Sequence, residues 1–413
     1  MANTLKLGAG KWATGTDTVL SFNDENNNFK PLPFSFSRAS SATVVNQSGL
    51  IETVGSGEPR IDFKDNTKGA LLLEPSRTNI IPYSEDFSNA SWTKSGASIS
   101  SDVITSPDGS LNADKIVEGT STGEKFTQAI ITVSNATIYT ASVFVKFAGR
   151  EWIRLTDAQS SNRIHFNTKT GVFGSATGTV INYKSTLLGD GWYKLSLTTT
   201  SVATAYAMRI VLAENDNDVS YTGDGTSGVY IWGAQLEVGS YATSYIPTSG
   251  SAVTRVVDAC SQTVPDGVIG QTEGTMYAEI NIPSIESVGT YTGFNIFNFA
   301  SPSANKISID FYNTGRVQAT SFSGSSLVVN IDITNYGLTS GIHKMAFAYK
   351  LNDYILYIDG SIVGSDTSAT VPSTDILDLY NTSGTNSGSL NHNEVKLYNT
   401  RLSNAELQAL TTI

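Results

Sequence analysis

Two tryptophans beside basic residues are the side chains of this sequence best suited to bind a ligand. Trp152 lies two residues before Arg154, and Trp192 lies two residues before Lys194. Because successive side chains of a strand point to opposite faces, each tryptophan shares the polar face of its strand with a cation. An indole exposed there can stack on the apolar face of a sugar, and these four residues are the candidate carbohydrate-binding site. The alternative is that a loop, the N-terminal region or another subunit covers both rings.

The usual catalytic side chains lack the spacing that catalysis or metal binding requires. The three histidines, His165, His343 and His392, lie in unrelated contexts without a metal-ligand spacing. His343 begins a predicted strand, where a structural role is expected. The single cysteine, Cys260, is expected to be a small buried residue. The sequence contains no serine-hydrolase elbow and no glycine-rich phosphate loop.

Acidic residues are numerous enough for chance pairs, so a pair alone does not predict glycoside cleavage. None of the 37 acidic residues belongs to a pair flanked by the aromatic and polar residues of a catalytic cleft. We therefore expect a protein that is not an enzyme and needs no cofactor. Calcium is an alternative at residues 215–218, Asn-Asp-Asn-Asp, whose oxygen ligands alternate. This loop lacks the glycine and glutamate of the EF-hand pattern, which favours a solvated acidic loop.

Period-two alternation of apolar and polar residues predicts strands along most of residues 80–257. The clearest segments are Tyr139–Phe147, Tyr193–Leu197, Tyr206–Leu212 and Tyr230–Leu236. Polar, glycine-containing turns separate them, as in a β-sandwich. In the last segment Trp232 shares its phase with Ala234 and Leu236, so we predict that it lies in the core.

Residues 258–413 combine further strand signals with one helix signal. His343–Lys350 and Tyr354–Ile358 are predicted strands, and Asp359-Gly360 predicts a two-residue hairpin turn. Ser403–Glu406 fits a capping box that starts a short helix. The chain is therefore predicted to be all-β, with two β-sandwich domains in series.

Residues 1–79 are rich in turns and have few apolar residues for a core of their own. We expect a small β-rich N-terminal region there, followed by domains over residues 80–257 and 258–413. A packed β-domain and an attachment region are both consistent with this composition.

Composition and charge exclude several classes of partner. The chain has 413 residues, a net charge of −11 and 15% charged residues. A negative net charge argues against nucleic acid or an anionic membrane as the main partner. The sequence contains no apolar run of about 18 residues that could insert into a membrane. Residues 1–20 lack the apolar core of a signal peptide, so we expect synthesis in a cytoplasm.

A further set of motifs is Phe36–Ser40, Pro59–Asp62, Leu71–Asn79, Tyr83–Phe87, Trp92 and Tyr241–Thr248. These motifs resemble those of bacteriophage virion proteins of the tail-fibre and head-fibre kind, especially in crAss-like phages of Bacteroidetes. The resemblance implies a virion protein made in the cytoplasm of a bacterial host, with residues 1–79 as its attachment region. It also implies other virion proteins as partners and assembly of the chain into a homo-oligomer, such as the trimer common among phage fibres.

Two further resemblances concern the large blocks. Residues 80–257 resemble a jelly-roll carbohydrate-binding module, and residues 258–413 resemble a laminin-G-like, concanavalin-A-like lectin. The motifs behind these resemblances are Gly189–Tyr193, Tyr230–Glu237, His343–Gly364 and Asn393–Leu410. The expected function is a structural fibre, spike or decoration protein that engages host-surface glycans. A spacer without a glycan site and a tailspike-like polysaccharide depolymerase are the alternatives.

Overall fold

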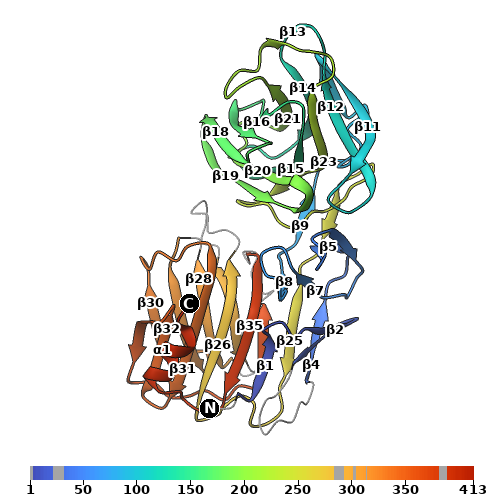
Figure 1. Cartoon of the computed structure of the whole chain (residues 1–413). Helices are drawn as coiled ribbons and strands as arrows, with labels where there is room; N and C mark the ends of the chain where they lie inside the picture. Colours follow the sequence, from blue (N-terminus) through green and yellow to red (C-terminus); the bar gives the residue numbers. More distant parts are fainter. Residues whose placement is uncertain (1–2, 22–31, 283–292, 301–303, 313, 381–387) are drawn as a thin grey trace. The chain divides into compact units, whose positions relative to one another are not determined.

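The computed structural model describes residues 3–21, 32–282, 293–300, 304–312, 314–380 and 388–413. The regular secondary structure of the described residues is almost all β-strand (Figure 1), which confirms the predicted all-β fold. It separates into two compact units. Unit 1 comprises Met1–Gln47, Val54–Ser76 and Val256–Ile413, and unit 2 comprises Ser48–Thr53 and Arg77–Arg255.

Two large sheets form unit 1. The first has the order β33-β32-β31-β26-β35-β8-β7, with β1 also paired to β35. Its strands are β1 (Leu5–Gly8), β7 (Arg60–Asp62), β8 (Ala70–Leu73), β26 (Glu273–Ile282), β31 (Gly341–Lys350), β32 (Asp353–Ile358), β33 (Ser361–Asp366) and β35 (Leu390–Tyr398). The second has the order β2-β3-β4-β25-β34-β27-β28-β29-β30. Its strands are β2 (Ala13–Gly15), β3 (Thr18–Ser21), β4 (Leu32–Ser37), β25 (Ala259–Thr263), β34 (Ile376–Tyr380), β27 (Gly293–Ala300), β28 (Lys306–Tyr312), β29 (Val317–Ser323) and β30 (Ser326–Ile333).

The N-terminal strands belong to the same sheets as the C-terminal strands. β1 and β8 pair with β35, and β4 pairs with β25. Apolar side chains from this part of the chain complete the unit 1 core: Leu5, Leu7, Phe34, Phe36, Leu71 and Leu73. The structure thus differs from the expected division at residue 79. The N-terminal region has too few apolar residues for a core of its own, but these residues are enough to extend the core that it shares with the C-terminal strands.

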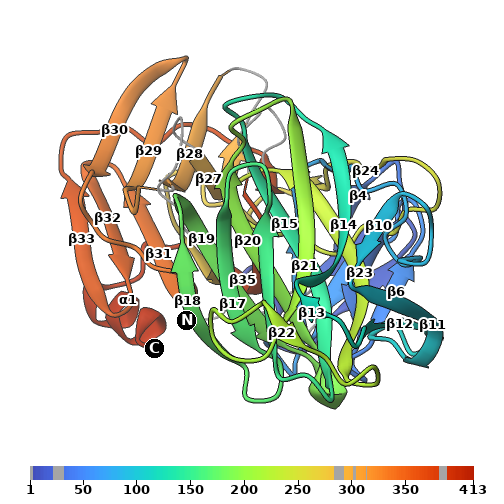
Figure 2. The same cartoon turned by 90° about the horizontal axis from the view of Figure 1, so that it is seen from above.

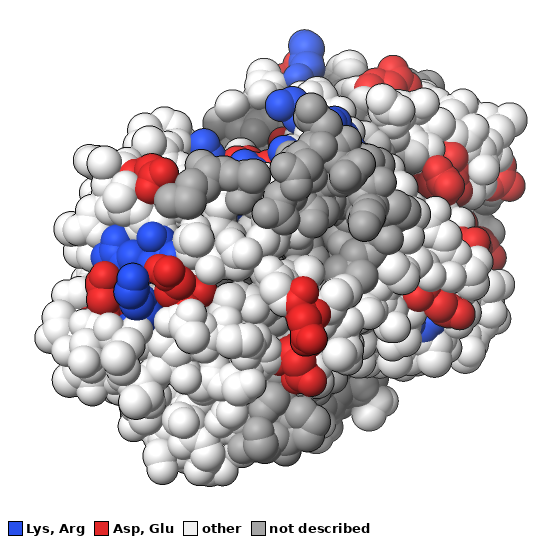
Figure 3. Space-filling model, turned by 90° about the horizontal axis from the view of Figure 1, so that it is seen from below, with Lys and Arg blue, Asp and Glu red and all other residues white. Residues whose placement is uncertain are grey.

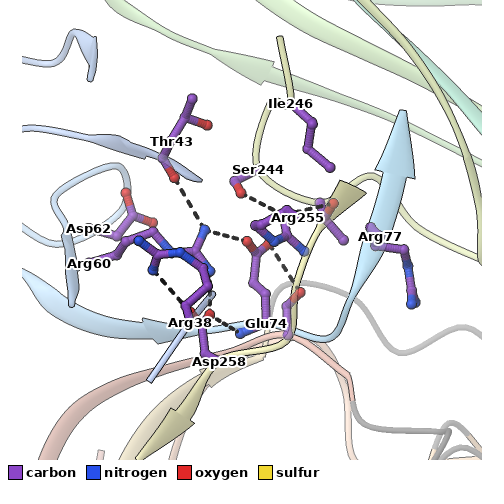
Figure 4. Close-up of polar contacts among 12 residues, drawn as sticks. Arg38, Thr43, Arg60, Asp62, Glu74, Arg77, Ser244, Ile246, Arg255 and Asp258 are labelled. Atoms are coloured by element: carbon purple, nitrogen blue, oxygen red, sulfur yellow. Dashed lines mark hydrogen bonds and ion pairs between the residues drawn. The ribbon is translucent and has the colours of Figure 1, made fainter. Parts of the chain in front are cut away.

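A buried network of charges also joins the N-terminal and C-terminal parts of unit 1 (Figure 4). Arg60 forms ion pairs with Glu74, at 2.6 Å, and with Asp258. Arg38 pairs with Asp258 at 3.1 Å. The side chains of Arg38, Arg60 and Asp258 are fully buried. Two cations and two anions balance one another, which is the condition for burying charge without a large penalty.

Unit 2 is a sandwich of two six-stranded sheets. The β16 sheet has the order β10-β14-β21-β16-β17-β18. Its strands are β10 (Trp92–Ser95), β14 (Lys125–Thr132), β16 (Trp152–Asp157), β17 (Asn162–Asn167), β18 (Val172–Thr177) and β21 (Ala205–Ala213). The β15 sheet has the order β11-β12-β23-β15-β20-β19. Its strands are β11 (Ala97–Thr105), β12 (Leu111–Glu118), β15 (Ile138–Ala148), β19 (Val180–Leu187), β20 (Tyr193–Thr200) and β23 (Gly228–Val238).

Alternate side chains of both sheets point inward and form the core of unit 2. Ile153 and Leu155 on β16 pack in one cluster with Val143 and Val145 on β15. Figure 2 labels β15 beside its hydrogen-bonded neighbour β20. On each strand, the residues that alternate with these core residues therefore point to the outer face of the sheet.

Short elements complete the fold. Three two-stranded sheets pair β5 (Ala42–Val45) with β6 (Ile51–Val54), β9 (Arg77–Asn79) with β24 (Val253–Arg255), and β13 (Thr122–Gly123) with β22 (Tyr221–Thr222). Gly189–Gly191 forms a 3-10 turn. The helix α1 (Asn404–Thr411) begins at the predicted capping box, where Ser403 and Glu406 bond each other's backbone N–H groups. None of the helical segments in the described ranges is long and apolar enough to cross a membrane.

The surface is sparsely charged. On the face drawn in Figure 3, Lys, Arg, Asp and Glu side chains form small separate groups on a mostly uncharged background. This agrees with a chain in which only 15% of residues are charged.

Candidate functional site

The four residues predicted to form one site lie on different sheets of unit 2. Trp152 and Arg154 are in β16, whereas Lys194 is in β20 and Trp192 directly precedes that strand. Their side chains alternate with inward-pointing core residues, so each pair belongs to the outer face of its own sheet. The outer faces of a sandwich point in opposite directions. The predicted grouping into one site is therefore wrong.

Trp192 is not an exposed aromatic residue. Its side chain is only 1% exposed, and its indole N–H donates to the carbonyl oxygen of Thr105 at 3.3 Å. Lys194 is half-buried, and its ammonium group donates to the carbonyl oxygen of Thr243 at 2.6 Å. The end of β11 thus contacts Trp192, and the segment after β23 contacts Lys194, which agrees with the alternative that other parts of the chain cover these residues.

Trp232 is buried, as predicted, but on the other side of its sheet. The pairing of β15 with β23 shifts between Ser142 and Phe144, so Trp232 lies opposite Phe144. Its ring packs 4.6 Å from the ring of Tyr245, centroid to centroid. Gly233, with a φ of 62°, is the extra residue of this bulge. A bulge reverses the alternation of side chains, which strict period-two counting cannot detect.

The outer face of the β16 sheet is polar over three neighbouring strands. Arg154 lies opposite His165 on β17, and Thr156 lies opposite Arg163 on β17 and Arg209 on β21. Arg163 and His165 alternate in sequence with two buried apolar residues, and this alternation could have indicated that both lie on the outer face. Sequence reasoning missed them because it searched histidines for metal spacing and tryptophans for exposed faces.

A shared carboxylate orders two of the arginines on this face. The Glu124 oxygens accept hydrogen bonds from Arg154 at 2.5 Å and from Arg209 at 3.2 Å. The Nε of Arg209 also donates to Gln128 at 2.7 Å, and its guanidinium lies 4.0 Å from the ring centroid of Phe126. These contacts fix the planes of both guanidinium groups without neutralising both charges.

His165 presents an acceptor without a partner. Its Nδ1 lies 3.1 Å from the carbonyl oxygen of Ser175, so Nδ1 carries the proton and Nε2 keeps its lone pair. Burial lowers the pKa of His165, and the charge of Arg154 acts in the same direction, so the ring is neutral at pH 7. The side chain is fully buried, and Nε2 has no hydrogen-bond partner in the part of the chain that the structure describes.

Two arginine nitrogens near His165 are likewise buried without a hydrogen-bond partner among the described residues. Nε of Arg154 and Nε of Arg163 are buried and make no hydrogen bond with any described residue. A buried polar group without a partner costs about 1–3 kcal/mol, and native structures contain few of them. Two donors and one acceptor therefore lie on adjacent positions of one sheet face, where a polar ligand could satisfy them.

Trp152 borders this group of polar atoms and is only partly buried. Its ring lies over Gly174 on β18, where an added Cβ would come within 2.7 Å of the Trp152 ring. Asp216 accepts hydrogen bonds from the backbone and the hydroxyl of Ser175 at 2.9 and 2.8 Å. Burial acts to raise the pKa of Asp216, but these hydrogen bonds keep it below its usual range. The indole is thus held in place while part of its surface stays open.

Ser175, His165 and Asp216 lie together but lack the order of a catalytic triad. The hydroxyl of Ser175 donates to Asp216, and the imidazole contacts Ser175 through Nδ1, at 3.2 Å from Oγ. In a triad the serine would donate to Nε2 and the carboxylate would accept from Nδ1–H. This geometry therefore does not prepare the hydroxyl as a nucleophile.

The structure gives no support for a metal centre at side chains. In the described ranges, no group of three or more His, Cys, Asp and Glu side chains could hold a metal ion. In the loop at residues 215–218, where calcium was considered, Asp216 is engaged by Ser175. Cys260 is buried and His343 bonds Asp359 at 2.6 Å, as expected of structural residues.

The fold and this face define an all-β protein with two sandwich units and one polar, partly aromatic sheet face. The chain matches no protein-family model and no curated protein. Among solved structures, it is similar to the receptor-binding domain of botulinum neurotoxin C/D mosaic serotype, with 11% identity and a TM-score of 0.32. That similarity covers 37% of this chain and 40% of the neurotoxin chain.

A second similarity is to the CBM40 of Ruminococcus gnavus IT-sialidase, a structure with bound α2,3-sialyllactose. It has 17% identity and a TM-score of 0.29 over 35% of this chain and 84% of that chain. The binding domain of Paraclostridial Mosquitocidal Protein 1 has 10% identity and a TM-score of 0.29 over 37% and 43% of the two chains. Similarities this weak assign neither a family nor a ligand to this chain.

Proposed function

We propose that unit 2 is a carbohydrate-binding module without enzymatic activity, and that its ligand binds the outer face of the β16 sheet. The proposal rests mainly on one observation: a partly open indole, Trp152, shares a sheet face with the partly exposed Arg163, whose side chain has no hydrogen-bond partner among the described residues. Most polar groups in native proteins are hydrogen-bonded, so an arginine side chain without a partner beside an open indole favours a ligand on this face.

The chemistry of these groups fits a sugar ring. The indole of Trp152 supplies an aromatic surface for the C–H face of a pyranose. The partly exposed guanidinium of Arg163 lies on the same sheet face and donates hydrogen bonds to sugar hydroxyls. Stacking of this kind contributes about 1–3 kcal/mol by analogy with bases on aromatic side chains. A single site is therefore weak, and several copies on one particle would raise avidity without new contacts.

The test is a glycan array probed with the full chain, followed by titration calorimetry of the glycans retained. Trp152→Ala should weaken binding about tenfold or more, because 1.4 kcal/mol corresponds to a factor of ten. The matched control is Tyr183→Ala, which removes an exposed ring from the β15 sheet. The proposal fails if the array retains no glycan, or if Trp152→Ala binds the retained glycan as tightly as Tyr183→Ala does.

We further propose that the chain is a structural virion protein, a fibre, spike or decoration component, in which this module engages host-surface glycans. The support is the resemblance of the motifs at Leu71–Asn79 and Tyr83–Phe87 to phage fibre proteins. Other virion proteins and further copies of this chain are the partners that follow. Immunogold electron microscopy of phage particles with antibodies to this chain tests the location. Unlabelled particles would exclude it.

A further inference from the structure

The charges on the candidate face do not balance. Three arginines lie there, and Glu124 pairs with two of them, Arg154 and Arg209. Asp216, whose oxygens accept from Ser175, supplies a second negative charge, so three arginines stand against two carboxylates. In the described part of the chain, the side chain of Arg163 has neither a hydrogen bond nor an ion pair. This face is therefore locally cationic within a chain of net charge −11.

The position of Arg163 places its charge beside the proposed sugar site. Arg163 lies two residues from His165 on β17 and opposite Thr156, which neighbours Arg154 on β16. Side chains two apart on one strand share a face, so the three groups surround one patch. Arg163 is partly exposed, and its side chain makes no hydrogen bond with any residue of the described ranges. Guanidinium groups bind carboxylate and sulfate oxygens through paired N–H groups.

We propose that this face binds acidic carbohydrate, with a carboxylate or sulfate held by Arg163 and Arg154. Trp152 contacts the ring of the same sugar. Glu124 accepts from one terminal nitrogen of Arg154, so the anion meets the other terminal nitrogen of that guanidinium. This inference rests on the carbohydrate-binding function proposed above and names the class of its ligand.

The experiment measures binding of the full chain to two matched pairs of polymers by calorimetry. Polygalacturonate and its methyl ester differ in the carboxylate, and dextran sulfate and dextran differ in the sulfate. The unchanged protein should bind at least one acidic polymer tenfold or more tightly than its neutral partner. The acidic polymer that shows this preference identifies the anion. Added NaCl should weaken that binding, because an ion pair with an exposed anion is screened by salt.

Three variants connect the preference to Arg163. Arg163→Gln should remove the preference for the acidic polymer, and Arg163→Lys should keep part of it, because the charge remains. Lys184→Gln removes one charge from an exposed position in the β15 sheet and should change nothing. Thermal unfolding of each variant establishes that it is folded.

Two outcomes would overturn the inference. One is that neither acidic polymer binds more tightly than its neutral partner. The other is an acidic preference that survives in Arg163→Gln. If the glycan array retains neutral glycans and the acidic polymers show no preference, the proposed carbohydrate binding is supported, but the proposed acidic ligand is wrong. If the array retains no glycan at all, both the carbohydrate-binding function and the acidic ligand are wrong.

Discussion

At the scale of single residues, burial decides which aromatic side chains can meet a ligand. Trp192 has a polar neighbour two residues away, yet it is 1% exposed and bonded to Thr105. Trp152 has the same pattern in sequence and remains partly open. The difference arises from covering segments that lie far away in the chain, so a pattern of alternating polarity cannot separate the two.

Trp192→Ala should therefore act on stability. Truncating a fully buried aromatic residue costs about 3–5 kcal/mol, through lost transfer energy and an unfilled cavity. Trp152→Ala, the matched substitution at the partly open position, should cost clearly less. Urea unfolding of both variants measures this. Equal losses in the two variants would show that the burial of the two rings does not differ as described.

Asp114 should make the stability of unit 2 depend on pH. Burial raises the pKa of its carboxyl to about 6, against hydrogen bonds from the N–H groups of Asp102 and Phe87. The folded state then binds the proton more tightly than the unfolded state, where the pKa is about 3.9. This group therefore stabilises the fold fully below pH 4, and the contribution is lost as pH rises to 6. Its size is at most about 3 kcal/mol, at 1.36 kcal/mol for each pKa unit.

The measurement compares the unfolding free energies of the unchanged protein and Asp114→Asn at pH 4 and pH 7. The unchanged protein should lose stability relative to the variant as pH rises. The comparison with a variant is needed because His165, whose pKa is lowered by burial, contributes a dependence of opposite sign. A stability difference that is the same at both pH values would contradict the role of Asp114.

At the scale of elements, local signals in the sequence were sufficient where one segment decides its own structure. Asp359 and Gly360 have φ angles of 49° and 78°, the positive values that the predicted hairpin turn requires. Ser403 caps α1 as its spacing with Glu406 indicates. The alternation in β15 and β16 likewise predicted which side chains face the core.

Features that depend on distant segments could not be predicted in this way. The bulge at Gly233 reverses the face of Trp232, and its signal is one glycine among 36. The unpartnered nitrogens of Arg154 and His165 exist only because β16 and β17 pair in one register. The candidate face was therefore found in part, through Trp152 and Arg154, while Trp192 and Lys194 were assigned to it wrongly.

At the scale of the whole molecule, unit 1 is assembled from both ends of the described chain, and unit 2 is an insertion after Ser76. Motifs that resemble those of phage fibres meet inside unit 1. Arg38, Arg60 and Glu74 come from three of these motifs, and Asp258 completes their charge network. At these positions the motifs that resemble those of phage fibres supply residues that hold unit 1 together. The candidate binding face is formed by other residues.

Removing residues 1–76 should unfold what remains of unit 1 and leave unit 2 folded. The deletion takes away core residues such as Leu71 and Phe34 and leaves Asp258 buried without its cations. An uncompensated buried charge alone costs about 3–5 kcal/mol, a large part of the 5–15 kcal/mol that stabilises a typical domain. Circular dichroism and thermal unfolding of fragments 77–255 and 256–413 measure this. A cooperative unfolding transition of the isolated 256–413 fragment would contradict the shared core.

The central claim is that carbohydrate contacts the outer face of the β16 sheet, and the indole N–H signals of the five tryptophans test it directly. Trp12, Trp92 and Trp192 donate to the backbone carbonyls of Gly69, Tyr83 and Thr105. Trp232 is buried against Tyr245. In ¹⁵N-labelled full chain titrated with the glycan that an array retains most strongly, the Trp152 signal and the Nε2 signal of His165 should shift together. A titration that shifts other tryptophan signals while Trp152 and His165 stay unchanged would place the ligand elsewhere and contradict the claim.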